Sequence, residues 1–289
     1  MSWHGRTRSL GAAISFLDGI AMSNYTLEAE YYQQFDADLE STVPGEGYGG
    51  WQSARLDIAR EHTAVVVMHA WDTGTPAEYA GWHRAVEYMP RAKQIGERIF
   101  PGLLTAVRAS DLPLFHVVGG GDYYRDYPGY RRAEELAGPR DRGPDQVAAD
   151  PTLERLRAFR RERVFVGSHN ESDVTKGFAE LDFMPQARPE GSEGVAENSQ
   201  QLTALCHDAG INHLIYAGFA INWCLLLSPG GMAEMSQRGV MCSVLREAVT
   251  AVENRETARN ELCKEVALWR VALAFGFVFS VDEFIRAIN

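Results

Sequence analysis

Cysteine and lysine are both scarce in this sequence, and each shortage limits what the protein can be. The four cysteines are far apart, and no two of them form a C-x-x-C pair. Such spacing fits neither a disulfide framework nor a zinc site, and it is typical of a protein from a reducing compartment. The cysteines are Cys206, Cys224, Cys242 and Cys263, and the lysines are Lys93, Lys176 and Lys264.

Long apolar runs are absent as well. No segment approaches the roughly 18 consecutive apolar residues that a transmembrane helix needs. The run LGAAISFL after Arg6 and Arg8 is similar to the start of a secretion signal, but Asp18 interrupts it early. The sequence therefore predicts a cytoplasmic protein with no membrane partner.

Clusters of positive charge and nucleotide-binding motifs are also missing. With a net charge of −11 and no basic block, the chain does not suit nucleic acid as a partner. The most basic stretch, RAFRRER at Arg157–Arg163, is typical of a solvated helix face. The glycine triplet Gly119–Gly121 lacks both the Lys-[ST] of a P-loop and the spacing of a dinucleotide motif. We expect no cofactor.

What the sequence does contain is an alternation of strands and helices. At 289 residues, with 45% apolar and 23% charged residues, it is long enough for one large α/β domain with additions, or for two small domains. From Trp51 onward, short buried-strand patterns alternate with helical ones, which favours parallel β–α–β units. We predict a three-layer, Rossmann-like α/β domain with a mostly parallel sheet over residues 51–289.

The expected elements follow from apolar spacing. After an edge strand and a turn near Glu61, the expected strands are Ala64–Met68, Leu114–Val118, Arg163–Val166, Leu214–Ala217, Val240–Leu245 and Phe277–Phe279. A helix that begins near Met89 should be kinked or divided by Pro101. The other expected helices are Pro151–Arg161, Gln200–Asp208, a helix after Cys224 that closes at Gly239, and Glu256–Leu268.

Two segments fall outside this pattern. Residues 1–50 show no clear period and form an expected N-terminal arm, which packs either on a neighbouring subunit or on its own domain. Residues 122–195 are polar and rich in Tyr, Arg, Pro and Gly, so we expect an insertion that acts as a lid or makes subunit contacts.

The segment around Cys224 carries the strongest chemical pattern. A short apolar strand stops at Gly218, and Cys224 follows at the turn or first helical positions after it. At a helix N-terminus, free N–H groups and the positive end of the dipole stabilise a thiolate and an oxyanion. This setting favours a nucleophile over the alternative, a buried structural cysteine.

The same segment, GFAINWCLL, resembles the nucleophile segment of the isochorismatase-like cysteine hydrolases, which has the form G-[VIF]-x-T-[ND]-x-C-V. Gly218, Asn222 and Cys224 match that form, while Ile221 stands where the family usually has threonine. The resemblance covers residues 91–121 and 196–288.

This resemblance implies hydrolysis of a C–N bond in a small amide by three groups. They are the cysteine, an aspartate that ends the first strand, and a lysine that ends a middle strand. Backbone amides near a cis peptide bond hold the oxyanion; here they would be the N–H groups of Ala220 and Cys224, after a cis Phe219–Ala220 bond.

The sequence departs from the family at two of these positions. His69 stands in place of the aspartate, so we predict a Cys224–His69 pair with Asp72 orienting the imidazole. No lysine stands where the pattern expects one, and Arg188 is the nearest cation. Arginine can hold a carboxylate or an oxyanion, but it does not shuttle protons at neutral pH. No D-x-H cluster supports a metal.

The remaining assignments concern the substrate and the alternatives. The predicted substrate-binding residues are Trp71, His116, Arg188, Asn222 and Trp223. Tyrosines between 123 and 130 either line a pocket for the substrate, or cover the sheet end or form a dimer contact. We expect a homo-oligomer, a dimer or a tetramer. Two rival readings are a catalytically silent binding protein and a vinyl-ether hydrolase that uses an acid near His69 instead of the cysteine.

Overall fold

The protein alternates strands and helices along residues 24–140, 143 and 146–289, the part of the chain that the computed structural model describes. The strands are β1 (Asn24–Gln33), β2 (Gly50–Ala59), β3 (Thr63–Met68), β4 (Trp71–Asp72), β5 (Leu114–Val117), β6 (Asp182–Phe183), β7 (Gly194–Ala196), β8 (His213–Phe219), β9 (Met241–Thr250) and β10 (Val278–Phe279). The helices are α1 (Ala80–Ala85), α2 (Met89–Arg98), α3 (Phe100–Ala109), α4 (Pro128–Ala137), α5 (Pro151–Arg163), α6 (Glu171–Ala179), α7 (Ser199–Ala209), α8 (Met232–Gln237), α9 (Leu262–Ala274) and α10 (Val281–Ile288). The secretion-signal-like run of residues 10–17 lies outside the described residues.

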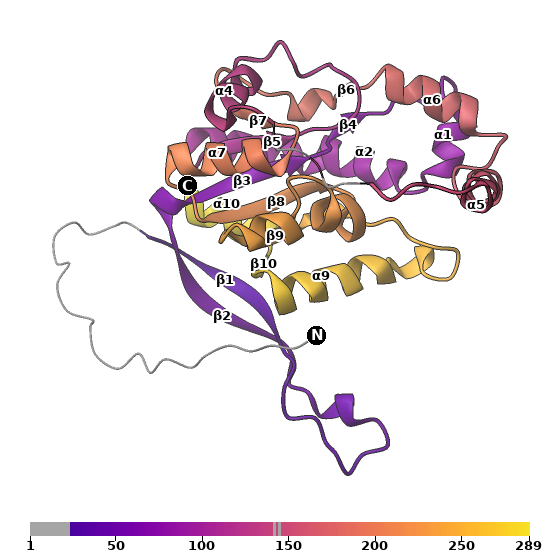
Figure 1. The fold of residues 1–289 in the computed structure, drawn as a ribbon. Helices are drawn as coiled ribbons and strands as arrows, with labels where there is room; N and C mark the ends of the chain where they lie inside the picture. Colours follow the sequence, from indigo (N-terminus) through magenta and orange to yellow (C-terminus); the bar gives the residue numbers. More distant parts are fainter. Residues whose placement is uncertain (1–23, 141–142, 144–145) are drawn as a thin grey trace.

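One sheet of eight strands organises the molecule, in the order β2-β1-β10-β9-β8-β3-β5-β7 (Figure 1). From β10 to β7 all neighbouring strands are parallel, and Met68 of β3 pairs with Gly218 of β8. The strands β3, β5, β8 and β9 are therefore neighbours in one parallel sheet, as their sequences predict. Every residue of β3 and β8 is buried, which explains their unbroken apolar runs.

Helices cover both faces of the sheet, so the fold is the predicted three-layer α/β architecture (Figure 1). Side chains of a strand point alternately to opposite faces. Val66 and Tyr216 accordingly pack in one core with apolar residues of α7, α8 and α9. Val67 and Ile215 pack in the other core with residues of α2, α3 and α10.

Proline and glycine set several boundaries of these helices. Pro101 divides the predicted helix near Met89 into α2 and α3, as expected. The single helix predicted between Cys224 and Gly239 is wrong. A π-helical turn, Ile221–Leu225, comes first, and α8 begins only at Met232. Between them lies Pro229, which lacks an N–H, and Gly230, which has a φ of +80° that favours glycine.

Two other predictions from local pattern fail. The strand predicted at Arg163–Val166 is absent, because α5 continues to Arg163 and the next two apolar side chains are exposed. No neighbouring strand in the described residues pairs with this segment. The last long helix begins at Leu262 instead of Glu256 and extends to Ala274.

The N-terminal region contains a strand that the sequence pattern did not reveal. Strand β1 pairs along its whole length with β2, from Asn24 with Ala59 to Gln33 with Gly50, and meets β10 where Glu30 pairs with Val278. The tip of this hairpin, residues 34–49, projects away from the body of the molecule (Figure 1). We call residues 34–49 the arm.

Candidate active site

Cys224 lies just beyond the carboxyl end of β8, where the chain turns sharply. The peptide bond between Phe219 and Ala220 is cis, as the resemblance predicts. The Ala220 carbonyl then accepts hydrogen bonds from the N–H groups of Trp223 (3.1 Å) and Leu225 (3.2 Å), which closes the turn. The Cys224 carbonyl accepts from the Ser228 N–H (3.0 Å), and its thiol is half-buried.

The other cysteines are less suited to be nucleophiles. Burial raises the pKa of the Cys206 and Cys242 thiols to about 12, so both stay protonated at neutral pH. Cys263 is half-buried, and its sulfur lies 3.3 Å from the Thr257 hydroxyl. Only Cys224 combines partial exposure with a position at the end of a central parallel strand, where α/β proteins bind ligands.

His69 follows β3, the strand next to β8, so it lies at the same edge of the sheet. Its backbone has a φ of +50°, in the left-handed region. The imidazole is buried and stacks on Trp71, with ring centroids 4.5 Å apart. Burial lowers the pKa of His69 to about 4, although a hydrogen bond to the Val118 backbone raises it in part. The ring is therefore neutral at pH 7.

The two nitrogens of the His69 ring have different surroundings. Nε2 faces Gly119, since a Cβ placed on Gly119 would lie 3.2 Å from it, and the ring is hydrogen-bonded to the backbone of the preceding residue, Val118. Nδ1 is buried and has no hydrogen-bond partner among the described residues. If Nε2 carries the proton for the Val118 carbonyl, the lone pair on Nδ1 is unpartnered and can accept a proton.

Tyr88, at the start of α2, is a site residue that the sequence pattern did not reveal. Burial raises the pKa of the Tyr88 phenol, and negative charge on the Cys224 thiolate and on Glu87 raises it further. A protonated phenol therefore lies within electrostatic range of the Cys224 sulfur. Such a hydroxyl can donate a hydrogen bond to a substrate held there.

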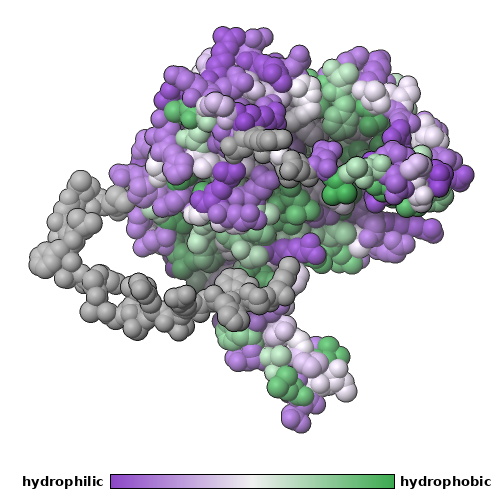
Figure 2. Space-filling model, in the orientation of Figure 1, coloured by the Kyte–Doolittle hydropathy of each residue, from purple (hydrophilic) through white to green (hydrophobic). Residues whose placement is uncertain are grey.

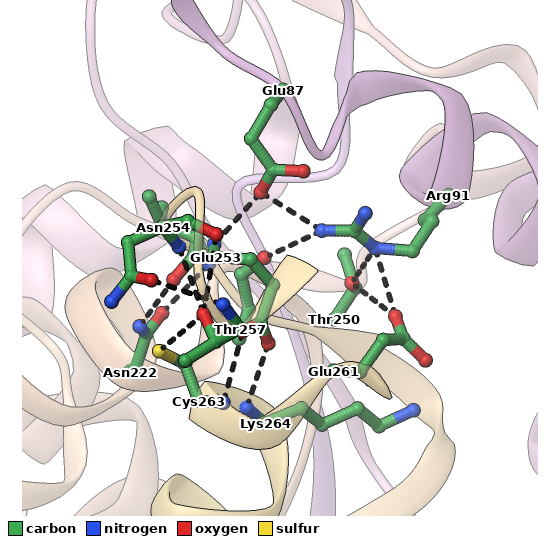
Figure 3. A network of polar contacts seen from close by, with 12 residues as sticks. Glu87, Arg91, Asn222, Thr250, Glu253, Asn254, Thr257, Glu261, Cys263 and Lys264 are labelled. Atoms are coloured by element: carbon green, nitrogen blue, oxygen red, sulfur yellow. Dashed lines mark hydrogen bonds and ion pairs between the residues drawn. The ribbon is translucent and has the colours of Figure 1, made fainter. Parts of the chain in front are cut away.

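Asn222 ties the turn that carries Cys224 to the segment after β9. Its side-chain Nδ2 donates to the Val252 carbonyl (2.8 Å), and its Oδ1 accepts from the Val252 N–H (2.9 Å). Figure 3 shows Asn222 within a larger polar network. Both polar groups of the predicted substrate-binding Asn222 are thus engaged with the backbone of its own chain.

Arg91 and Glu253 are the centres of that network (Figure 3). Arg91 of α2 donates to the Thr250 hydroxyl and the Ala251 carbonyl and forms ion pairs with Glu87 and Glu261. The buried Glu253 carboxylate accepts the N–H groups of Cys263 and Lys264, both at 3.0 Å, in the first turn of α9. Although burial raises the pKa of Glu253, hydrogen bonds from Thr257 and these N–H groups outweigh it and lower the pKa.

Replacing Asn222 with alanine is expected to lower the free energy of unfolding by about 1–3 kcal/mol. The reason is that the Val252 N–H and carbonyl both lose their partner. Urea denaturation measures the change. Asn260→Ala is the matched control, since Asn260 is exposed nearby and none of the side-chain hydrogen bonds above involves it. Equal losses in the two variants would contradict a special role for the Asn222–Val252 pair.

The other predicted site residues have different surroundings. Trp71 stacks on His69 and donates its indole N–H to the Tyr123 hydroxyl (2.9 Å). Asp72 is exposed, and its carboxylate accepts the Gly74 N–H (3.0 Å). Trp223, next to Cys224, is 58% exposed. The His69 ring is hydrogen-bonded to the backbone of Val118, whereas the Asp72 carboxylate, which was expected to orient it, bonds to the Gly74 N–H.

His116 belongs to a cluster around Glu193, which the backbone carbonyl of Arg188 joins by accepting a hydrogen bond from Arg108 (2.9 Å). His116 is buried, and its Nε2 lies 2.8 Å from the Glu193 carboxylate, which also pairs with Arg108 at 2.7 Å. Although burial raises the pKa of Glu193, the hydrogen bonds from His116 and Arg108 lower it to about 2. Arg188 is exposed, and it pairs with Asp182.

Lys176 and the tyrosines between 123 and 130 make contacts within their own part of the fold. Lys176 is exposed and lies over the Tyr79 ring, 5.4 Å from its centroid. Tyr124 and Tyr130 are buried together over the sheet end. Within the described residues, no three His, Cys, Asp or Glu side chains are grouped so as to hold a metal ion. None of the described helices is long and apolar enough to cross a membrane.

Solved structures that match this chain include several described as isochorismatase-like or isochorismatase-family proteins. A cysteine hydrolase from Pseudomonas syringae pv. phaseolicola 1448A matches with a TM-score of 0.47 and 15% identity, over 80% of this chain and 94% of that one. An isochorismatase-like hydrolase from Alkaliphilus metalliredigens matches with a TM-score of 0.44 and 15% identity, over 79% and 98% of the two chains. N-carbamoylsarcosine amidase from Thermoplasma acidophilum matches with a TM-score of 0.40 and 16% identity, over 77% and 98%.

No protein-family model and no curated protein matches the chain.

Proposed function

We propose that this protein is a cysteine hydrolase that cleaves a C–N bond in a small amide, with Cys224 as the nucleophile and His69 as the base. One observation carries the proposal. A half-exposed thiol follows β8, and a buried imidazole with an unpartnered nitrogen follows the adjacent parallel strand β3. A nucleophile and a neutral base at one sheet edge are the minimum for acyl transfer.

The reaction begins with proton transfer from the Cys224 thiol to Nδ1 of His69, directly or through one water. The sulfur attacks the amide carbon, and the amide oxygen becomes an oxyanion held by the N–H groups of Ala220 and Cys224. The C–N bond then breaks as His69 returns the proton to the leaving amine, which leaves a thioester on Cys224. A water molecule hydrolyses the thioester, giving its proton to His69 and restoring the thiol.

The surroundings of His69 fit a base and not a permanent cation. Because burial lowers its pKa to about 4, the ring holds no proton at pH 7 and can accept one. A thiolate nearby would favour the imidazolium, so the two groups stabilise each other's charged forms. Trp71, stacked on the imidazole, and the exposed Trp223 would bound the substrate on two sides.

The test is the alkylation of Cys224 by iodoacetamide, measured against pH by peptide mass spectrometry. We expect half-maximal reactivity below the pH of about 8.5 at which free cysteine ionises, because His69 takes the thiol proton. In His69→Ala the midpoint should rise toward that value. His207→Ala, at an exposed histidine, is the control. Identical midpoints near 8.5 in the wild type and His69→Ala would favour a catalytically silent binding protein.

A further inference from the structure

The arm carries a strong negative charge, and none of its residues is buried in the described part of the chain. Residues 34–49 contain Asp36, Asp38, Glu40 and Glu46 and no lysine or arginine, so the net charge is −4. The arm also leaves large apolar side chains in contact with solvent: Phe35 is 57% exposed, Leu39 83% and Val43 52%.

Local hydrogen bonds nevertheless give the arm a defined shape. The Asp38 N–H donates to the Pro44 carbonyl (3.0 Å), and the Asp38 carboxylate accepts from the Glu40 N–H (3.1 Å). At the base of the arm, the Trp269 indole donates to the side chain of Gln34 (2.9 Å). An arm held in this way loses little conformational entropy when it binds.

Helix α5 has the opposite charge and is also exposed to solvent. All its residues are exposed, and its five arginines outweigh two glutamates to give a net charge of +3. Glu154 and Glu162 pair with Arg157 and Arg163. Acidic partners for Arg155, Arg160 and Arg161 are missing from the described part of the chain.

The apolar side chains of α5 also lack a partner. Leu156 and Phe159 are 59% and 60% exposed, and the stripe continues past the helix to Val164 and Phe165, at 63% and 60%. Asp150 caps the helix, since its carboxylate accepts the N–H groups of Thr152 and Leu153. Most helices gain their stability by packing an apolar face, but no residue of α5 is buried against the described part of the chain.

The arm and α5 lie far apart in one molecule. Figure 1 shows the arm below the body, with α5 at the edge beside α1 and α6. Figure 2 shows apolar and hydrophilic surface mixed at both places. The two surfaces therefore cannot cover each other within one chain, although they match in charge and in exposed apolar residues.

We propose that a second copy of this chain is the partner, with the arm of one copy docked on α5 of the other. The acidic residues of the arm would pair with Arg160 and Arg161, and Phe35 and Leu39 would cover the apolar stripe. Each copy carries one arm and one α5, so a two-fold axis gives two equal contacts. The opposite charges also favour this register over arm-to-arm contact. The proposal is independent of the chemistry at Cys224.

Charge reversal tests this contact. Arg160→Glu with Arg161→Glu changes the net charge of α5 from +3 to −1, so both surfaces are acidic. Asp36→Lys, Glu40→Lys and Glu46→Lys together change the net charge of the arm from −4 to +2, so both surfaces are basic. We expect wild type to sediment as a dimer or larger assembly and each variant as a monomer. A 1:1 mixture of the two variants should assemble again, because each acidic arm meets a basic helix and each basic arm meets an acidic helix. Recovery in the mixture also excludes misfolding as the cause of monomers.

The control variant, Arg98→Glu with Arg270→Glu, carries the same charge change as the α5 variant at exposed positions on α2 and α9 and should assemble like wild type. Analytical ultracentrifugation at low and high salt measures all five samples, and salt should weaken the assembly. A monomeric wild type would overturn the proposal. So would reversed variants that keep the wild-type mass, or a mixture that stays monomeric.

Discussion

Replacing Cys224 with alanine is expected to abolish hydrolysis of every amide that the protein cleaves, while the protein stays folded. The substitution removes one sulfur from a half-buried turn, which should cost on the order of 1 kcal/mol of stability. Without the sulfur no thioester can form, so the loss of turnover should be complete within detection. His69→Ala should lower the rate by roughly 10²–10⁴, the usual contribution of a general base.

Hydrolysis of a panel of small amides, followed as released amine, measures this effect. Cys263→Ala is the matched control, because Cys263 is the other half-buried cysteine and should keep full activity. Turnover that survives in Cys224→Ala would exclude a thioester mechanism. If that activity were then lost in His69→Ala, the acid-dependent hydrolase that does not use the cysteine would become the better reading.

Stability is expected to fall steeply between pH 7.5 and pH 5. Burial lowers the pKa of both His69 and His213 to about 4, below the ordinary value of 6.5. Between these values the unfolded chain binds protons that the folded chain does not, so lowering the pH favours unfolding. Each of the two histidines should contribute roughly 2 kcal/mol to this loss over that range.

Urea denaturation at the two pH values, in the wild type and His213→Gln, isolates one of these contributions. The pH-dependent loss should be about 2 kcal/mol smaller in the variant, whatever the variant's overall stability. The lowered pKa of Glu193, about 2, adds little here because most of that carboxyl's titration lies below pH 5 in both states. His207→Gln, at an exposed histidine, should behave as wild type. An unchanged pH-dependent loss in His213→Gln would mean that the folded protein protonates His213 readily.

The elements that could be predicted from sequence are those whose own residues show the pattern of the element. Strands β3 and β8 have uninterrupted apolar runs because both their faces are covered, and Pro101 marks a helix break by its chemistry alone. Strand β1 was missed although Tyr25, Leu27 and Ala29 alternate inward, because it depends on pairing with β2 along the whole hairpin. The π-helical turn at Cys224 reads locally as the start of an ordinary helix.

The candidate site was only partly predictable for a related reason. Cys224 and His69 could be named because each follows a recognisable strand, and parallel strands bring such ends to one edge. Tyr88 and Arg91 could not be named from the pattern around them. Arg91 meets Thr250 across 159 positions of sequence, and only the packing of α2 against the end of β9 joins them.

The double hydrogen bond between Asn222 and Val252 divides the turn around Cys224 into fixed and variable positions. The side chain of Asn222 is fixed by two hydrogen bonds to the backbone of Val252, whereas Trp223, next in the chain, is 58% exposed. Mutation at position 223 can therefore change what lies over the thiol without displacing the thiol itself. A site arranged in this way can acquire a new substrate preference by single substitutions, because the residue open to variation is not the one that holds the turn in place.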